Sequence, residues 1–251
     1  MNDIRMNKEA GIARLSIYAL SKDGAIDDGF CLQVQKIVED LKRDQGIKVL
    51  ILSGTPEVFC YGATKDFLRE LNAHYKNHVE HDYAHHLKAL LDLPIPVIAA
   101  MEGSATGGGL VLGLYADIIV AAEESRYGMS FMNMGFTPGM GSTAMCREVF
   151  GYHGGFEMLV TGIYRKGSEL KGKCGFNYIL PRTEVMAKAM DLAAAIAEKP
   201  RTSLELLKKY MSIERRKMLE ESSTTEAFMH RISFNQTEVE TLIQEHFGGQ
   251  P

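Results

Sequence analysis

The sequence predicts an α/β fold with a helical C-terminal region. Apolar runs of strand length alternate along the chain with segments of helical spacing, which is the pattern of an α/β protein. Two of the runs, "IKVLILSG" (47–54) and "IPVIAAMEG" (95–103), are almost unbroken, as expected of strands covered on both faces. The tail from 202 to 247 has a helical pattern almost throughout.

The elements of the first half follow in order. "IARLSIYAL" (12–20) alternates apolar and polar residues and predicts a strand. Residues 27–44 begin with acidic residues and predict a helix. Next comes the strand at 47–54. It is followed by a polar, mostly helical region from about 65 to 92. The apolar positions that give the helix over 27–44 its spacing are Leu32, Ile37, Val38 and Leu41.

The second half continues the alternation. A short helix is expected at about 107–114, between the strand at 95–103 and a buried strand at "ADIIVAAE" (116–123). Helical segments predominate from 141 to 199, broken by a short strand at "CGFNYILP". No Pro- or Ser-rich linker precedes the tail. We therefore expect a core over residues 1–198 and a helical region over 199–251 that packs on it.

Composition excludes several classes of protein. The 251 residues are 45% apolar, which is enough for a real core, and the net charge of −4 provides no basic field for nucleic acid. No apolar run approaches the ~20 residues of a membrane span, and the polar N-terminus lacks the apolar segment of a secretory signal. Four scattered cysteines without a CxxC pair favour a reduced, cytoplasmic setting.

Two local patterns resemble ligand sites incompletely. "GSELKGKC" (167–174) is close to a phosphate loop, but Cys174 stands where the magnesium-binding hydroxyl is needed. The histidines between 74 and 86 include pairs four residues apart, which could hold a metal on one helical face. No carboxylate or cysteine completes such a set, so we expect no metal. The histidines are His74, His78, His81, His85 and His86.

Two junctions carry the chemistry. "FCYGATKDF" (59–67) and "MEGSATGGGLVLG" (101–113) each predict a strand end, a glycine turn and a helix start. Such junctions leave backbone N–H groups unpaired, and glycines let a ligand approach the backbone closely. Two N–H groups directed at one oxygen form an oxyanion hole. The residues alone leave open the alternative that the glycines serve only packing.

Together the two junctions resemble those of the crotonase (enoyl-CoA hydratase/isomerase) superfamily. The resemblance runs from "VLILSGTPEVFCYGATKDF" through "IPVIAAMEGSATGGGLVLGLYADIIVAAEESRYG" to "FTPGMGST" and "CGFNYILP". It implies a spiral of repeated ββα units with a helical C-terminal region, assembled as a homotrimer or hexamer. It also implies that the N–H groups of Ala63 and Gly108 form an oxyanion hole for a thioester carbonyl.

The chain departs from the hydratases of that family at both catalytic glutamates. Val111 stands at the first position, in "GGGLV", and Phe131 stands at the second, in "YGMSF". Neither side chain can transfer a proton or orient water, so ordinary hydration is not expected. Both residues instead make the substrate pocket apolar.

Two further stretches resemble one branch of the superfamily, the decarboxylating members of the HMG-synthase cassettes that install β-branches in polyketides. They are "FMNMGFTPGMGST" (131–143) and "EAFMHRISF" (226–234). His230 matches the branch's catalytic histidine, although from the residues alone it is one histidine on a C-terminal helix. Tyr61 and Lys65 match its Tyr-x-x-x-Lys pattern, which not every member carries in full. A lysine in the first turn of a helix opposes the helix dipole, which favours a purpose other than stability, although a solvated surface lysine stays an alternative.

The resemblance implies decarboxylation of a 3-methylglutaconyl thioester to a 3-methylcrotonyl thioester. In that reaction Lys65 holds the departing carboxylate beside Tyr61, and His230 protonates the dienolate. The thioester is the electron sink, so no cofactor is expected, and the acyl group is carried by acyl carrier protein or CoA. The alternatives are another crotonase reaction on an acyl thioester, such as dehydration or a different decarboxylation, and an inactive crotonase that serves as a scaffold for carrier protein.

Overall fold

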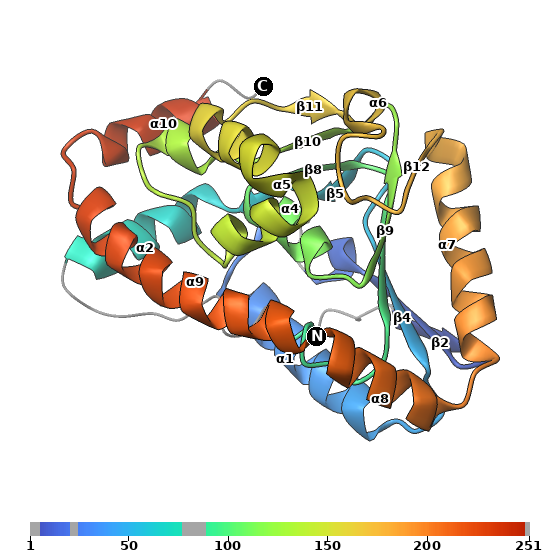
Figure 1. The fold of residues 1–251 in the computed structure, drawn as a ribbon. Helices are drawn as coiled ribbons and strands as arrows, with labels where there is room; N and C mark the ends of the chain where they lie inside the picture. The colour runs from blue at the N-terminus through green and yellow to red at the C-terminus, as the bar shows by residue number, and fades with distance from the viewer. Residues whose placement is uncertain (1–5, 21–24, 77–88, 249–251) are drawn as a thin grey trace.

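The fold is built around one large, mostly parallel sheet. The structure is a computed structural model that describes residues 6–20, 25–76 and 89–248. Within them, six strands pair in the order β1-β2-β4-β7-β9-β12 (Figure 1), and every neighbouring pair is parallel except β1 with β2. The strands are β1 (Met6–Glu9), β2 (Ile12–Ser16), β4 (Val49–Ser53), β7 (Val97–Met101), β9 (Ile118–Ala122) and β12 (Tyr178–Leu180).

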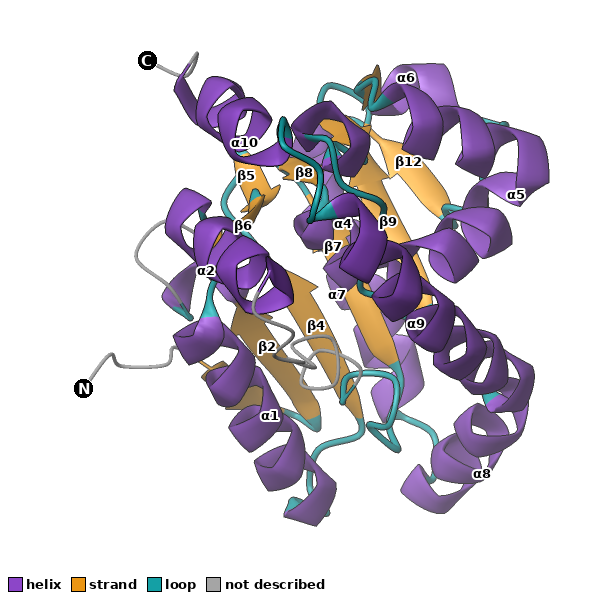
Figure 2. Cartoon of the chain, turned by 90° about the vertical axis from the view of Figure 1, so that its left-hand side faces the viewer, coloured by secondary structure: helices purple, strands orange, loops and turns teal. Residues whose placement is uncertain are grey.

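Helices cover both faces of this sheet, which explains the unbroken apolar strands. Side chains alternate between faces along a strand, so Val49 and Ile51 pack toward α7 (Arg182–Ala197) while Leu50 and Leu52 belong to the larger core on the other side. Figure 2 views the sheet from that other side, with α7 behind the strands. The helices in front are α1 (Asp28–Arg43), α2 (Lys65–Lys76), α4 (Gly108–Leu114), α5 (Ser142–Thr161) and α9 (Ile213–Ser233).

A second sheet gives the chain its repeating ββα units. Its strands pair in the order β11-β10-β8-β5, and a short parallel pair joins β3 to β6. Strand β4 of the large sheet is followed by β5 of the second sheet and then α2, and β7, β8 and α4 repeat this sequence. The expected spiral of ββα units is confirmed. The strands are β3 (Ala25–Ile26), β5 (Val58–Cys60), β6 (Gly62–Ala63), β8 (Ser104–Thr106), β10 (Arg126–Gly128) and β11 (Arg165–Lys166).

Two local expectations differ from the structure. The strand expected over 12–20 ends at Ser16, and a 3-10 helix, η1 (Ile17–Ala19), follows it. Helix α1 forms where expected, with the Asp27 side chain accepting the Phe30 N–H at 2.7 Å. Leu32, however, is 59% exposed. It lies two residues before the buried Val34, and residues two apart do not share a helical face.

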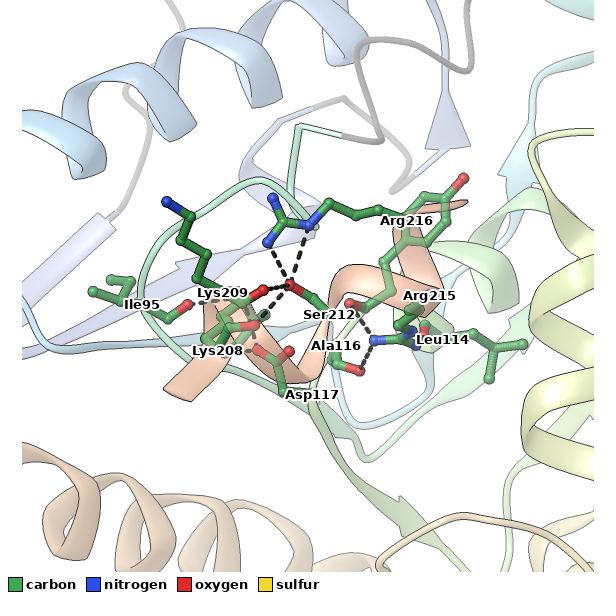
Figure 3. Close-up of polar contacts among 11 residues, drawn as sticks. Ile95, Leu114, Ala116, Asp117, Lys208, Lys209, Ser212, Arg215 and Arg216 are labelled. Carbon is green, nitrogen blue, oxygen red and sulfur yellow. Dashed lines mark hydrogen bonds and ion pairs between the residues drawn. The ribbon is translucent and has the colours of Figure 1, made fainter. Parts of the chain in front are cut away.

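The C-terminal helices pack on the core, as expected. They are α8 (Arg201–Met211), α9 and α10 (Val239–Gly248). At the α8–α9 junction (Figure 3), the buried Lys208 Nζ donates to the Ile95 carbonyl at 2.8 Å and pairs with Asp117 Oδ2 at 2.8 Å. Arg215 binds carbonyl oxygens of Leu114 and Ala116 at the end of α4. The boundary near residue 198 stays a prediction.

The remaining elements connect these layers. Helix α5 contains a kink at Gly151 and follows a 3-10 helix that begins at Phe131. No helix among the described residues is long and apolar enough to cross a membrane. The connecting elements are η2 (Phe131–Met134) and α6 (Gly167–Leu170).

Candidate active site

A cavity of about 790 Å³ lies between α1, α2 and α9. It reaches both glycine junctions, because Ala63 and Gly108 are among its lining residues. Phe131, Phe136 and Met140 form an apolar part of its wall. This volume and mainly apolar lining are typical of small-molecule sites in proteins. Both junctions border this cavity, and the oxyanion hole expected from them stays a prediction.

The first junction contains the short strand β6, whose residue Ala63 lines the cavity. Gly62 has φ +84°, and a Cβ at this position would lie 2.8 Å from the Thr106 carbonyl oxygen and 3.2 Å from Gly108 N. Only glycine allows this approach of the two junctions. The Thr64 N–H donates to the Ile26 carbonyl at 3.1 Å, on the side of β3. Because successive N–H groups of a strand point to opposite sides, the Ala63 N–H points away from β3.

The second junction is the start of α4. The N–H groups of Leu110 and Val111 both bond to the Gly107 carbonyl, so the N–H of Gly108 precedes the first intrahelical bonds. A Cβ on Gly108 would lie 2.7 Å from Met140 Sδ, which places the Met140 side chain directly over this N-terminus. Val111 is wholly buried one turn further along α4. It is not among the described residues that line the cavity, and its expected place in the substrate pocket stays a prediction.

The segment 137–143, which carries Met140 and ends in the first turn of α5, is bound to one face of α9. Glu226 is buried and accepts the Gly141 N–H at 2.6 Å and the Thr143 N–H at 2.9 Å. Two turns later, Ser233 Oγ lies 3.2 Å from the Thr137 N. Positions 226, 230 and 233 share one helical face, so His230 stands in the middle of this row.

His230 has hydrogen-bond partners at both ring nitrogens. Nε2 lies 2.9 Å from the Thr137 carbonyl oxygen, and Nδ1 lies 3.2 Å from the hydroxyl oxygen of Tyr75. Burial lowers the pKa of His230 to about 4, so the ring is neutral at pH 7. A carbonyl only accepts, so Nε2 carries the proton and Nδ1 accepts from the Tyr75 hydroxyl. His230 also lines the cavity, and its catalytic role stays a prediction.

The close packing at His230 explains a glycine of the "FTPGMGST" stretch. A Cβ on Gly139 would lie 2.5 Å from His230 Cε1. Any larger residue would therefore push the imidazole ring away from the Thr137 carbonyl. The stretches 131–143 and 226–234, which were singled out by resemblance, are physically coupled through these contacts.

Tyr61 and Lys65 lie elsewhere. Tyr61 is 52% exposed, and Lys65 is the first residue of α2 and half-buried. Neither belongs to the described residues that line the cavity. Their assigned roles stay predictions. Phe131, by contrast, is buried at the cavity wall, with its ring 6.2 Å from that of Phe136 in a T-shaped pair.

Charged side chains also line part of the cavity. Lys42 pairs with Glu39 at 2.9 Å, and Arg216 lies 3.8 Å from Asp92. Both cations therefore already have carboxylate neighbours. Within the described part of the chain, no group of three His, Cys, Asp or Glu side chains could hold a metal. His78, His81, His85 and His86 lie outside the described residues.

Sequence reasoning missed two residues of this site, Tyr75 and Glu226. Glu226 was within a stretch that had been singled out, and its spacing of four from His230 was a usable signal for a shared face. Tyr75 had no comparable signal. Its hydroxyl meets His230 only because α2 and α9, 155 residues apart at this contact, pack together.

The geometry can now be set beside known proteins. Residues 7–247 match the family model of enoyl-CoA hydratase/isomerase. The chain belongs to the enoyl-CoA hydratase/isomerase family. The expected resemblance to the crotonase superfamily is therefore confirmed over nearly the whole chain.

Similar proteins narrow the branch of the family. The chain is 36% identical to the bacillaene synthase decarboxylase PksI of Bacillus subtilis (strain 168) over 210 residues, which cover 84% of this chain and 83% of the relative. It is 32% identical to a solved structure of a dehydratase/decarboxylase enzyme couple involved in polyketide β-branching, with a TM-score of 0.90 and coverage of 98% and 99%. The ECH2 decarboxylase domain of CurF from Lyngbya majuscula gives 32% identity, a TM-score of 0.87 and coverage of 98% and 100%.

Proposed function

We propose that this protein decarboxylates a 3-methylglutaconyl thioester to a 3-methylcrotonyl thioester in polyketide β-branching. One observation carries the proposal. The cavity combines two junctions suited to hold an oxyanion with side chains that cannot ionise at the two positions where hydratases carry glutamates: Phe131, which lines the cavity, and Val111, which is buried in α4. The named decarboxylases among the similar proteins support the same reaction type.

The reaction needs only an electron sink and a proton. The bond between the γ carbon and the distal carboxylate breaks and releases CO₂. The electron pair forms a new double bond at the γ carbon, the former double bond shifts toward the thioester, and the charge settles on the carbonyl oxygen. A proton added at the γ carbon restores the conjugated enoyl thioester. No electron leaves the substrate, so no redox partner is required.

The N–H groups of Ala63 and Gly108 are proposed to stabilise the dienolate oxygen. Both backbone groups belong to the cavity lining, and the close contact of Gly62 with Gly108 N brings the junctions together. Backbone donors that are already fixed in place need little reorganisation during the reaction, so such sites stabilise developing charge well.

The apolar wall is proposed to promote loss of the carboxylate. Phe131, Phe136 and Met140 provide few hydrogen bonds to an anion. A charged carboxylate is poorly stabilised in such surroundings, whereas CO₂ is neutral. Loss of the charged carboxylate as neutral CO₂ is therefore favoured.

The roles of Lys65 and Tyr61 remain separate hypotheses. Lys65 adjoins the first junction, and its assignment to the departing carboxylate rests on the resemblance. The Lys65→Ala variant should then lose most decarboxylation while Lys65→Arg, which keeps the charge in another geometry, should retain part of it. Decarboxylation by Lys65→Ala at the wild-type rate would make Lys65 a surface residue and would remove Tyr61's proposed contact with it.

The acyl carrier is proposed to be acyl carrier protein, with CoA as the alternative. The similar proteins named for polyketide pathways favour the carrier protein. We further propose that the chain assembles as a homotrimer or hexamer. Large apolar side chains stand exposed on α5 and α8, among them Phe156, Leu206 and Tyr210, and an assembly would cover such surfaces.

The test offers the protein two thioesters on pantetheine or carrier protein, 3-methylglutaconyl and hydroxymethylglutaryl, and records the product masses. Loss of CO₂ from the first supports the proposal. Loss of water from the second, without loss of CO₂ from the first, would indicate dehydration instead. Binding of carrier protein with neither loss would indicate an inactive scaffold. A buffer blank and heat-denatured protein control for spontaneous loss.

A further inference from the structure

Tyr75 contacts His230 Nδ1 at the wall of the cavity. The Tyr75 hydroxyl oxygen lies 3.2 Å from His230 Nδ1, and both residues line the cavity. Both side chains are about nine-tenths buried. Few water molecules therefore compete for the hydrogen bond between the Tyr75 hydroxyl and the imidazole.

Only one ring nitrogen of His230, Nδ1, is in a position to transfer a proton toward a substrate. Its Nε2–H is held by the Thr137 carbonyl at 2.9 Å, and that segment is fixed in turn by Glu226 and Ser233. The Glu226 carboxylate, one turn earlier on the same face of α9, is occupied by Gly141 and Thr143. A proton that leaves His230 for a ligand must therefore leave from Nδ1, in the direction of Tyr75.

The Tyr75 ring is held rigidly. It stacks on Phe234 with ring centres 5.0 Å apart and an interplanar angle of 4°. Phe234 stacks on Phe136 at 4.5 Å and 17°, and Phe136 lines the cavity. The stacking of these three rings fixes the position of the phenol oxygen, whereas a hydroxyl O–H bond rotates about its C–O bond. A hydroxyl proton adapts its direction in this way without movement of heavy atoms.

We propose that Tyr75 is the residue that delivers the proton to the γ carbon of the dienolate, and that His230 supplies this proton through the Tyr75 hydroxyl. The inference rests on the proposed function. When the substrate carboxylate enters, its negative charge favours the imidazolium form of His230, which takes a proton from solvent. Nδ1–H then donates to the Tyr75 oxygen, and the Tyr75 O–H turns toward the substrate.

The proton transfers balance over one turnover. After CO₂ leaves, the Tyr75 O–H bond breaks and a C–H bond forms at the γ carbon. The Nδ1 proton moves to the phenol oxygen, and His230 returns to its neutral form. The net change is one solvent proton transferred to carbon. Tyr75 is thus the catalytic donor, and Thr137 is a positioning residue that sets which nitrogen of His230 is free.

Tyr75→Phe tests the proposal because it keeps the three stacked rings and removes only the hydroxyl. A positioned proton donor contributes about 10²–10⁴-fold to rate, so formation of the conjugated product should fall by at least ~10²-fold. In D₂O the remaining product should carry deuterium at both the α and γ carbons instead of the γ carbon alone. The matched control is Tyr18→Phe, at an exposed tyrosine of η1, which should leave rate and isomer unchanged.

A double variant distinguishes one relay from two separate groups. If His230 acts only through Tyr75, the Tyr75→Phe/His230→Gln double variant should be no slower than the slower single variant. Independent roles would multiply the two losses and overturn the relay. An unchanged rate and γ-only deuterium in Tyr75→Phe would overturn the assignment of Tyr75 itself.

A binding measurement on the wild-type protein tests the relay without any variant. A 3-methylglutaryl pantetheine thioester carries the distal carboxylate but lacks the double bond, so it cannot decarboxylate. ¹⁵N NMR should show His230 protonated only at Nε2 in the free protein and at both nitrogens after this thioester binds. An unprotonated Nδ1 in the complex would exclude the relay. Failure of the wild-type protein to release CO₂ from 3-methylglutaconyl thioester would instead defeat the proposed function.

Discussion

At the residue scale, burial determines the protonation and hydrogen bonding of single polar groups in the site. His230 is a titratable side chain held neutral in an apolar pocket, with one nitrogen bound to a backbone carbonyl. Glu226 is a buried carboxylate whose bonds go to backbone N–H groups and a hydroxyl. Each group would be costly without its partners, so their positions are specified strongly.

Burial of His230 predicts a pH dependence of stability. The pKa of His230 is about 4 in the folded protein, against about 6.5 in an unfolded chain. Between these values the unfolded state binds the extra proton, so stability is lost as the pH falls from 6.5 toward 4. Between pH 7 and pH 4.5 the expected loss is about 2 kcal/mol. Urea unfolding at pH 7 and pH 4.5 measures it.

His230→Gln is the control for this pH dependence. The variant should lose less stability than the wild type over the same pH interval, whatever its stability at pH 7. Burial also lowers the pKa of His246, but this residue is present in both proteins and cancels in the comparison. Equal losses in the two proteins would show that His230 is not buried as described.

At the scale of elements, α9 holds the segment 137–143, which packs against the glycine junction at Gly108. Glu226, His230 and Ser233 bind this segment, and its Met140 lies over Gly108. Arg215 of the same helix binds the carbonyl end of α4. One helix therefore positions both ends of the unit that carries the proposed donor at Gly108.

Glu226→Gln should destabilise the protein and impair the site. The new amide N–H₂ group would face at least one N–H donor of the segment, which leaves buried donors unpaired at a cost of about 1–3 kcal/mol. The midpoint of urea unfolding should fall, and KM should rise because Met140 is held less firmly. Glu221→Gln, at an exposed position of the same helix, is the matched control and should change neither quantity. A wild-type midpoint in Glu226→Gln would contradict the role of Glu226 in holding the segment.

The elements were largely predictable from sequence, and the contacts between them were not. The strands at 49–53, 97–101 and 118–122 were identified because burial on both faces leaves an unbroken apolar run. The junctions were identified because glycine is required where backbones approach. Tyr75 could not be found in this way, because its contact with His230 depends on how α2 and α9 pack, and no local pattern records that.

At the scale of the whole molecule, the cavity lies where the spiral core and the C-terminal helices meet. The junctions come from the repeated ββα units, and His230 comes from α9. Neither part holds the whole proposed site. The division near residue 198 would therefore separate residues that line the same cavity.

Assembly is the prediction that belongs to this scale. The protein is expected to form a homotrimer or hexamer, because α5 and α8 expose large apolar side chains such as Tyr152, Phe156 and Tyr210. Native mass spectrometry at micromolar concentration measures the mass of the assembly. A Tyr210→Glu variant should shift the distribution toward the monomer. A stable wild-type monomer at that concentration would contradict the expectation.

The most direct test of the account follows ¹³CO₂ release from 3-methylglutaconyl thioester labelled in its distal carboxylate. Three folded proteins are compared by single-turnover kinetics: wild type, Gly108→Ala and Gly108→Pro. Both variants place a Cβ near Met140, but only proline lacks the N–H. The account predicts rapid ¹³CO₂ release by the wild type and release by Gly108→Pro that is ~10²–10³-fold slower than by Gly108→Ala. Equal rates in the two variants, or no ¹³CO₂ from the wild type, would contradict it.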